Sequence, residues 1–151
     1  MIRIGHSWLR GLIVMLVALM LLSGTGLHVA AAQTVSGTGT LEASGYGTVA
    51  LSGSGTVTIQ EGAGVIWVQG ADSIEATGRG RRVELPHGAV RLTGYSGRVQ
   101  IQGEDMTIRI AGGVINLTAS GSGSAWLSGE GTYTTNNSNG TWTPRGIRVT
   151  F

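Results

Sequence analysis

The chain has no cysteine and no lysine, only two prolines and a single phenylalanine among its 151 residues. Without cysteine there is no disulfide framework and no thiolate to serve as metal ligand or nucleophile. Without lysine there is no amine for Schiff-base chemistry, because arginine stays protonated at any working pH. These absences exclude several kinds of catalytic site and leave the stability of the fold to its apolar interior.

Charge is also scarce, at 12% of the residues, and it is balanced. All ten basic residues are arginines, and two of them, Arg3 and Arg10, lie in the N-terminal segment. From Gln33 onwards eight arginines therefore meet eight acidic residues, so this part has no net charge. A neutral chain gives little electrostatic support for binding nucleic acid, and no nucleic-acid partner is expected.

Residues 1–32 have the pattern of an export signal. A positively charged start precedes an uncharged, mostly aliphatic segment at 11–22, and Ala30 and Ala32 fit the small-x-small cleavage pattern. The sequence thus predicts cleavage before Gln33 and a secreted or cell-envelope protein. The alternative is an uncleaved anchor that tethers the protein to a membrane, with membrane contact only through residues 11–32.

A short unit recurs through the rest of the chain. A glycine-rich turn is followed by alternating apolar and polar residues, and the unit returns every eight or nine positions, as in the run 47–59. Alternation of this kind is typical of strands with one buried face. The first inward residue of each unit is predicted at Leu41, Val49, Val57, Ile66, Ile74, Val83, Val90, Val99, Ile108, Ile115, Ala125 and Tyr133.

A fixed short period favours an all-β, single-domain β-solenoid in which successive coils stack in parallel. An antiparallel β-sandwich or barrel remains the alternative, because regularly spaced short strands also fit that arrangement. The repeat domain is expected at 33–133. The remaining segment, 134–151, is polar at first and ends in Gly146–Phe151, a candidate capping strand.

Four of the units, Gly39–Ala43, Gly47–Leu51, Gly55–Ile59 and Gly97–Ile101, resemble the repeats of bacterial adhesin-type, glycine-rich β-solenoid proteins. The similarity covers roughly residues 37–131. It implies an exported fold and a role at the cell envelope or surface, and it supplies no catalytic residues.

The sequence offers little for catalysis or metal binding. His87 is the only histidine after residue 32, and its nearest orienting carboxylate would be Glu84. Apart from Glu104-Asp105, the acidic residues are scattered singly, and the turns carry Ser, Thr and Gly where calcium-binding β-rolls carry Asp. No enzymatic activity, no cofactor and no metal are therefore expected.

Aromatic and arginine side chains are the best candidates for a ligand surface. Trp67, Trp126 and Trp142 fall at outward positions of their predicted strands, where they either contact a ligand or are covered by a cap, a loop or a partner. The only local excess of charge is positive, and it either forms a basic ridge for anionic groups or is a solvated loop balanced by nearby glutamates; it comprises Arg79, Arg81, Arg82, Arg91 and Arg98. The candidate surface comprises Trp67, Trp126, Tyr95, Arg79, Arg81 and Arg82.

Two functions follow as expectations. The first is an exported structural or adhesin-like protein of the cell envelope that displays its side chains on a rigid ladder and can self-associate. The alternative is a module that binds carbohydrate or anionic glycan through exposed tryptophans and the arginine-rich turn. The expected partners are a cell-wall polymer, a glycan or a surface protein.

Overall fold

The computed structural model describes residues 38–60 and 64–151, which belong to one compact unit, 36–151. The predicted export signal at 1–32 lies outside these residues. Within the described part of the chain, none of the helical structure is long and apolar enough to cross a membrane.

About three quarters of the described residues lie in β-strands, which confirms the all-β prediction. Two strands are very long, β1 (Gly39–Ile59) and β6 (Val99–Thr135). The only helical element in this part is a single 3-10 turn, η1 (Pro86–Gly88). The short strands are β2 (Val65–Gln69), β3 (Ser73–Ala76), β4 (Arg81–Glu84), β5 (Val90–Thr93), β7 (Asn139–Trp142) and β8 (Ile147–Thr150).

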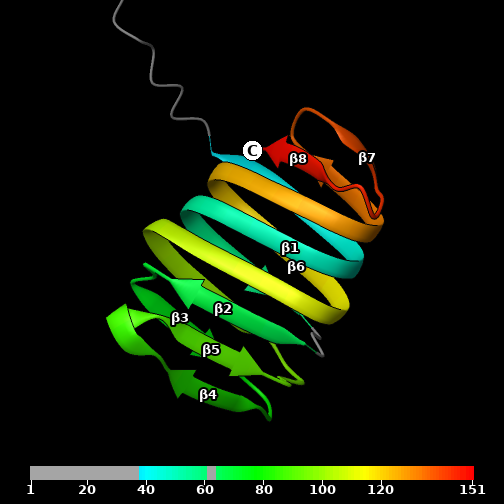
Figure 1. Cartoon of the computed structure of the whole chain (residues 1–151). Helices are drawn as coiled ribbons and strands as arrows, with labels where there is room; N and C mark the ends of the chain where they lie inside the picture. Colours follow the sequence, from blue (N-terminus) through cyan, green and yellow to red (C-terminus); the bar gives the residue numbers. More distant parts are fainter. Residues whose placement is uncertain (1–37, 61–63) are drawn as a thin grey trace, which may run out of the picture. The chain divides into compact units, whose positions relative to one another are not determined.

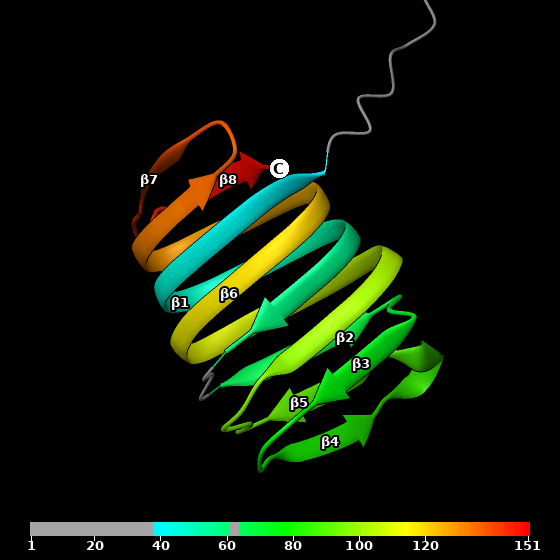
Figure 2. The same ribbon diagram turned by 180° about the vertical axis from the view of Figure 1, so that it is seen from behind.

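β1 lies between two passes of β6, and both pairings are antiparallel. Leu51, for example, lies opposite Ile108 on one side and opposite Ala125 on the other. Figures 1 and 2 show the two long strands winding past each other. All strand pairs among the described residues are antiparallel, so the parallel stacking expected for a solenoid is not found. The sheet is open, and the antiparallel sandwich alternative fits this pairing.

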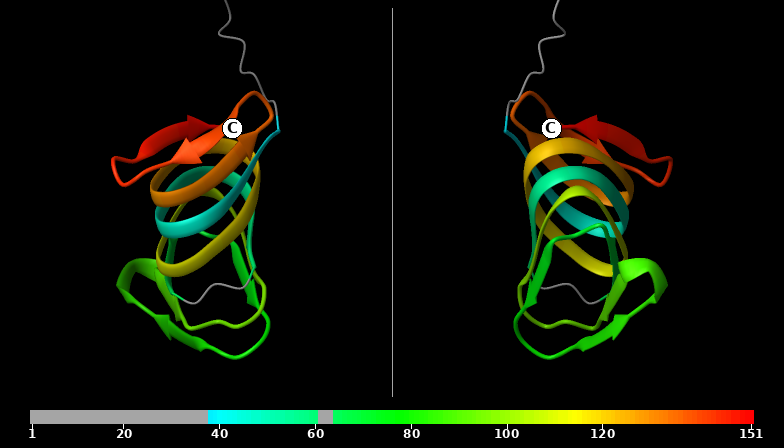
Figure 3. Two further views of the ribbon diagram at one scale, coloured as in Figure 1. Left: turned by 90° about the vertical axis from the view of Figure 1, so that its right-hand side faces the viewer. Right: turned by 90° about the vertical axis from the view of Figure 1, so that its left-hand side faces the viewer.

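The registers order the strand segments into two rows, which enclose the interior when viewed end on (Figure 3). The β3–β7 face runs from β3 through 99–102, 56–59, 115–120, 39–44 and 131–135 to β7. The β4–β8 face runs from β4 through β5, β2, 107–111, 48–52 and 124–128 to β8. The long strands β1 and β6 contribute to both faces.

The interior is filled by the alternating apolar residues. Ten of the twelve predicted inward residues are buried: Leu41, Val49, Val57, Ile66, Val90, Val99, Ile108, Ile115, Ala125 and Tyr133. Ile74, near the β3 end of the interior, is only partly buried. The two-residue period of the sequence therefore predicted which side of most strands faces the core.

Val83 is the exception, and the prediction that it points inward is wrong. In β4, Val83 lies opposite Arg91, which is on the outer side, whereas Arg82 lies opposite the fully buried Leu92. A register difference of one residue moves every side chain of a strand to the other face of the sheet. β4 is an edge strand at one end of the sheet, where one more apolar side chain would have few partners.

Paired glycines allow the long strands to pass from one face to the other. Gly47, with φ of 133°, lies opposite Gly129, with φ of 128°. Side chains other than hydrogen rarely tolerate such angles. A Cβ at Gly47 would lie 2.1 Å from the carbonyl oxygen of Ser128, so the two backbones approach more closely than any larger residue permits. At these corners β1 stays paired with residues 121–131 of β6 in one register, whereas the other pass of β6 has an extra residue, since Gly55 lies opposite Gly103 and Gly53 opposite Met106.

Trp142 lies inside the protein, so the prediction that it faces outwards is wrong. Its side chain is only 2% exposed, and it lies opposite Gly131. The glycines at 45 and 131 leave room for the indole ring, because a Cβ at either position would come within 2.8 Å of it. Trp142 thus covers the interior at the β7 end. The candidate capping strand, β8, pairs with 124–127 and forms the last strand of its face.

The corner geometry predicts that Gly47→Ala is severely destabilising. The added methyl group would clash with backbone rather than with a flexible side chain, and the φ angle would be strained as well. We expect a loss of about 3 kcal/mol or more in the free energy of unfolding, measured by urea denaturation.

Gly112→Ala is the matched control, because Gly112 also has a positive φ, of 80°, but an added Cβ would meet no atom within 4 Å. This variant should lower the free energy of unfolding by about 1 kcal/mol, because only the backbone angle is unfavourable for alanine there. Equal losses for the two variants would show that close approach at the corner is not a special constraint.

Candidate ligand-binding face

Tryptophan and arginine side chains line up across the outer side of the β4–β8 face. They occupy the middle position of successive strand segments, each flanked along its own strand by inward residues. In order across the strands, the cross-strand partners are Arg148, Trp126, Ala50, Arg109, Trp67, Arg91 and Val83. We call the six neighbouring side chains from Arg148 to Arg91 in this order the Trp–Arg row.

Both tryptophans in the row are accessible. Trp67 is 38% exposed and Trp126 is 42% exposed, and the three arginines of the row are exposed as well. Directly opposed residues on antiparallel strands have Cβ atoms ~5 Å apart. Trp67 therefore has an arginine on each side, Arg91 and Arg109, and Trp126 has Arg148 on one side. A cation close to an indole favours both ring–cation attraction and recognition of a ligand that carries negative charge.

A hollow opens beside Trp67. It has a volume of about 420 Å³ and is lined by Trp67, Val68, Gln69, Ala89, Thr107 and Arg109. An indole, a guanidinium and polar side chains thus border one concave region. This combination of an apolar wall with a few polar groups is typical of sites for small ligands or for units of a polymer.

Trp126 is positioned by the turn between β7 and β8. Gly146 lies against its ring, since a Cβ at that glycine would be 2.2 Å from Cζ2 of the indole. The same glycine has a φ of 76° and donates a backbone hydrogen bond of 2.8 Å to the carbonyl of Thr143. The turn therefore packs against the tryptophan and leaves the rest of its surface accessible.

The two faces differ in charge, although the chain from Gln33 is neutral. The outer side of the β4–β8 face carries Arg81 in addition to the arginines of the row. No Asp or Glu lies among the described strand residues on that side. The outer side of the β3–β7 face instead carries Glu42 and Glu75 among Thr, Ser, Asn and Gln residues. Arg98, at the border of that face, donates to the side chain of Gln100.

The structure brings some of the predicted surface residues together and separates others. Trp67 and Trp126 lie on the β4–β8 face, and Arg81, opposite Thr93, lies on its outer side as well. Arg79 is in the turn before β4, where its backbone nitrogen donates to Ser96 Oγ at 3.2 Å. Tyr95 packs against the core and against Gly80, so most of its ring is committed to the fold.

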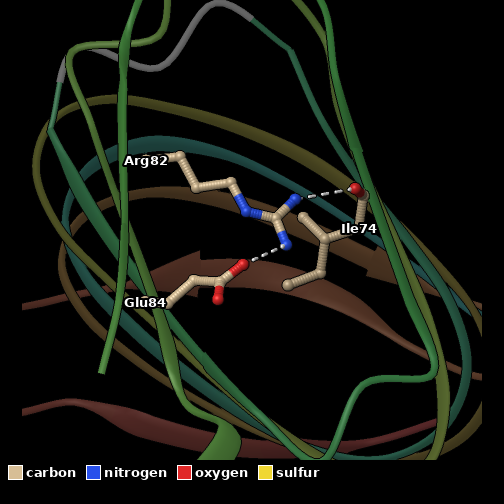
Figure 4. Close-up of polar contacts among 3 residues, drawn as sticks. All are labelled: Ile74, Arg82 and Glu84. Atoms are coloured by element: carbon tan, nitrogen blue, oxygen red, sulfur yellow. Dashed lines mark hydrogen bonds and ion pairs between the residues drawn. The ribbon is translucent and has the colours of Figure 1, made fainter. Parts of the chain in front are cut away.

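Arg82 has a structural position, shown in Figure 4. Its Nη1 donates to the carbonyl oxygen of Ile74 at 3.3 Å, and its Nη2 lies 3.6 Å from Oε1 of Glu84. The guanidinium therefore reaches from β4 to β3 across the end of the interior, between the two faces. It is not available to the Trp–Arg row, although it neighbours Arg81 in the sequence.

Arg109 and Arg148 were missed as candidate residues, yet a signal for the row exists in the sequence. A strand segment often has a glycine at each end, one three positions before its middle residue and one three positions after it. The triplets on this face are Gly47-Ala50-Gly53, Gly64-Trp67-Gly70, Gly88-Arg91-Gly94 and Gly123-Trp126-Gly129. The spacing identifies middle residues, but which of them become neighbours depends on the long-range register.

Other parts of the surface are less suited to a ligand. A larger hollow, of about 520 Å³, lies along the corner glycines and is bordered by Ser54, Asp72 and Glu104, without an aromatic ring. His87 is exposed in η1 and has a φ of 62°. In the described ranges, no three His, Asp or Glu side chains are grouped so that they could hold a metal ion.

We predict that the Arg82–Glu84 ion pair contributes little to stability. Both side chains are well exposed, at 42% and 78%, and solvent screens such pairs strongly. A double-mutant cycle with Arg82→Gln and Glu84→Gln should give a coupling of less than about 1 kcal/mol in urea denaturation. A coupling above about 2 kcal/mol would contradict this prediction and show that the pair is a major stabilising contact of β4.

Comparison with protein-family models, with curated proteins and with solved structures finds no match for this chain. The resemblance to adhesin-type repeats therefore stays a prediction, and functional inference rests on the geometry of the Trp–Arg row.

Proposed function

We propose that this is an exported, non-catalytic module whose β4–β8 face binds a sugar polymer bearing anionic groups. The observation that carries the proposal is the placement of Trp67 between Arg91 and Arg109, beside a hollow. The outer side of this sheet face is exposed, and its described strand residues include no Asp or Glu. The proposal corresponds to the glycan-binding alternative of the sequence analysis, with a different set of arginines.

The chemistry of the row suits such a ligand. An exposed indole presents a flat apolar surface on which the C–H face of a sugar ring can stack. A guanidinium binds carboxylate, sulfate or phosphate through two parallel hydrogen bonds, which gives geometric specificity as well as charge. Alternation of the two side-chain types therefore matches a polymer in which rings and anionic groups alternate.

The scaffold supports binding rather than catalysis. The row lies on paired strands, so its side chains are held at a fixed spacing with little backbone freedom. Single-stranded nucleic acid also combines rings with negative charge. Zero net charge from Gln33 onwards and the predicted export favour a glycan.

A structural or adhesin-like role is the second candidate, and the ends of the sheet favour it. Among the described residues, β3 pairs only with β6, and β4 pairs only with β5. Each leaves one edge free, and free edges can pair with another chain. Self-association through these edges and glycan binding through the row are compatible in one protein.

The binding test uses the chain from Gln33 to Phe151 with heparin, polygalacturonate, neutral dextran and single-stranded DNA, measured by isothermal titration calorimetry. We expect binding to the two anionic polysaccharides. Trp67→Ala and Arg109→Gln should each weaken it about tenfold, equivalent to ~1.4 kcal/mol. Affinity should fall as salt rises, because salt screens the arginines.

Tyr46→Ala is the matched control, since Tyr46 is an exposed aromatic residue, at 62%, that lies on a corner away from the row. Its loss should change affinity less than about twofold. Equal weakening by Tyr46→Ala and Trp67→Ala, or tightest binding to DNA, would refute the proposal. Absence of polysaccharide binding by the folded protein, together with self-association, would favour the structural role.

A further inference from the structure

The Trp–Arg row contains two clusters separated by a small residue. Arg91, Trp67 and Arg109 form the first cluster, and Trp126 with Arg148 forms the second. Ala50 lies between Arg109 and Trp126 and is half-buried. Resting on the function proposed above, we propose that the clusters are two subsites that one anionic sugar polymer occupies together, with its chain lying across the strands.

The direction of the ligand follows from what surrounds each tryptophan. Along β2, the next outward residues on either side of Trp67 are Val65 and Gln69, and the serines at 124 and 128 flank Trp126 in the same way. A polymer that followed a strand would therefore meet one tryptophan and no row arginine. A polymer that crosses the strands meets both clusters.

The strand spacing sets the length of ligand required. Neighbouring strands lie ~4.8 Å apart, so the three steps from Trp67 to Trp126 span ~14 Å. The five steps from Arg91 to Arg148 span ~24 Å. Ala50 has no side chain beyond Cβ, so a polymer chain can pass over it close to the sheet.

Two linked subsites predict a specific dependence of affinity on ligand length. Once one cluster is occupied, the second binds the same polymer intramolecularly, at a high effective concentration. Affinity should therefore rise steeply as the ligand becomes long enough to reach both clusters. It should then level off, because a longer chain gains no further contacts within one protein molecule.

The experiment measures dissociation constants of the chain from Gln33 for size-fractionated heparin oligosaccharides and oligogalacturonates. It compares complexes in which one oligomer binds one protein molecule. We expect affinity to increase at least about tenfold between oligomers shorter than ~14 Å and those longer than ~24 Å. The sulfated and carboxylated series show which anionic group the arginines prefer. The length dependence should appear in whichever series binds.

Two variants locate the second subsite. Trp126→Ala should abolish the gain for long oligomers while leaving the affinity for short ones within about twofold, and Arg148→Gln should do the same. Tyr46→Ala should leave both affinities unchanged. Circular dichroism of each variant verifies that it is folded.

Several results would overturn the inference. Equal affinity for short and long oligomers would show a single subsite, while the proposed function itself would stand. A length dependence that Trp126→Ala leaves intact would place the second contact elsewhere. Failure of every oligosaccharide and polysaccharide to bind would refute both the inference and the proposed function.

Discussion

The close approach of backbones at the glycine corners is the constraint on which the rest of the fold depends. A Cβ at Gly55 would lie 2.1 Å from the carbonyl oxygen of Ser120. A Cβ at Gly121 would lie at the same distance from the carbonyl oxygen of Ser54. Larger residues at these positions would push the strands apart where they change face. Because only hydrogen occupies this space, β1 and residues 121–131 of β6 continue as paired strands through the corners.

Continuity through the corners of β1 preserves the alternation of inward and outward residues along that strand. In the corner Gly53-Ser54-Gly55 the two glycines are two positions apart, which is one full period of a β-strand. Odd-numbered residues of β1 therefore face the interior both before and after this corner. Leu51 before the corner and Val57 after it are both buried. One interior is therefore lined by both faces, and each face has a regular outer side on which residues midway between corners become neighbours.

Local pattern was enough to predict much of this fold. Alternation in single segments predicted the inward position of residues such as Val49 and Ile108, and it placed Trp67 and Trp126 on the outer side. It also predicted an all-β protein. These properties depend on the period of side chains along one strand, which the sequence displays directly.

The features that the sequence predicted wrongly, or not at all, all depend on pairing between residues far apart in the chain. Parallel and antiparallel arrangements share the same two-residue period, so the pattern could not tell that β1 would pair twice with β6. The inward position of Trp142 depends on the glycines at 45 and 131, and that of Arg82 depends on the carbonyl of Ile74 across the interior. The Trp–Arg row likewise exists only after residues 59 positions apart, Ala50 and Arg109, have become partners.

Winding of β1 against β6 assembles the Trp–Arg row, and disulfide cross-linking between the two strands measures this register most directly. Because the chain contains no cysteine, a pair introduced by Ala50→Cys and Arg109→Cys would be the only thiols present. Opposed strand positions are close enough for a disulfide. Mass spectrometry after mild oxidation should find an intramolecular disulfide in this variant. It should find little in the pair Ala50→Cys and Arg91→Cys, which lie three strand steps, or ~14 Å, apart. Absence of the first bond, or equal formation of both, would contradict the register that creates the row.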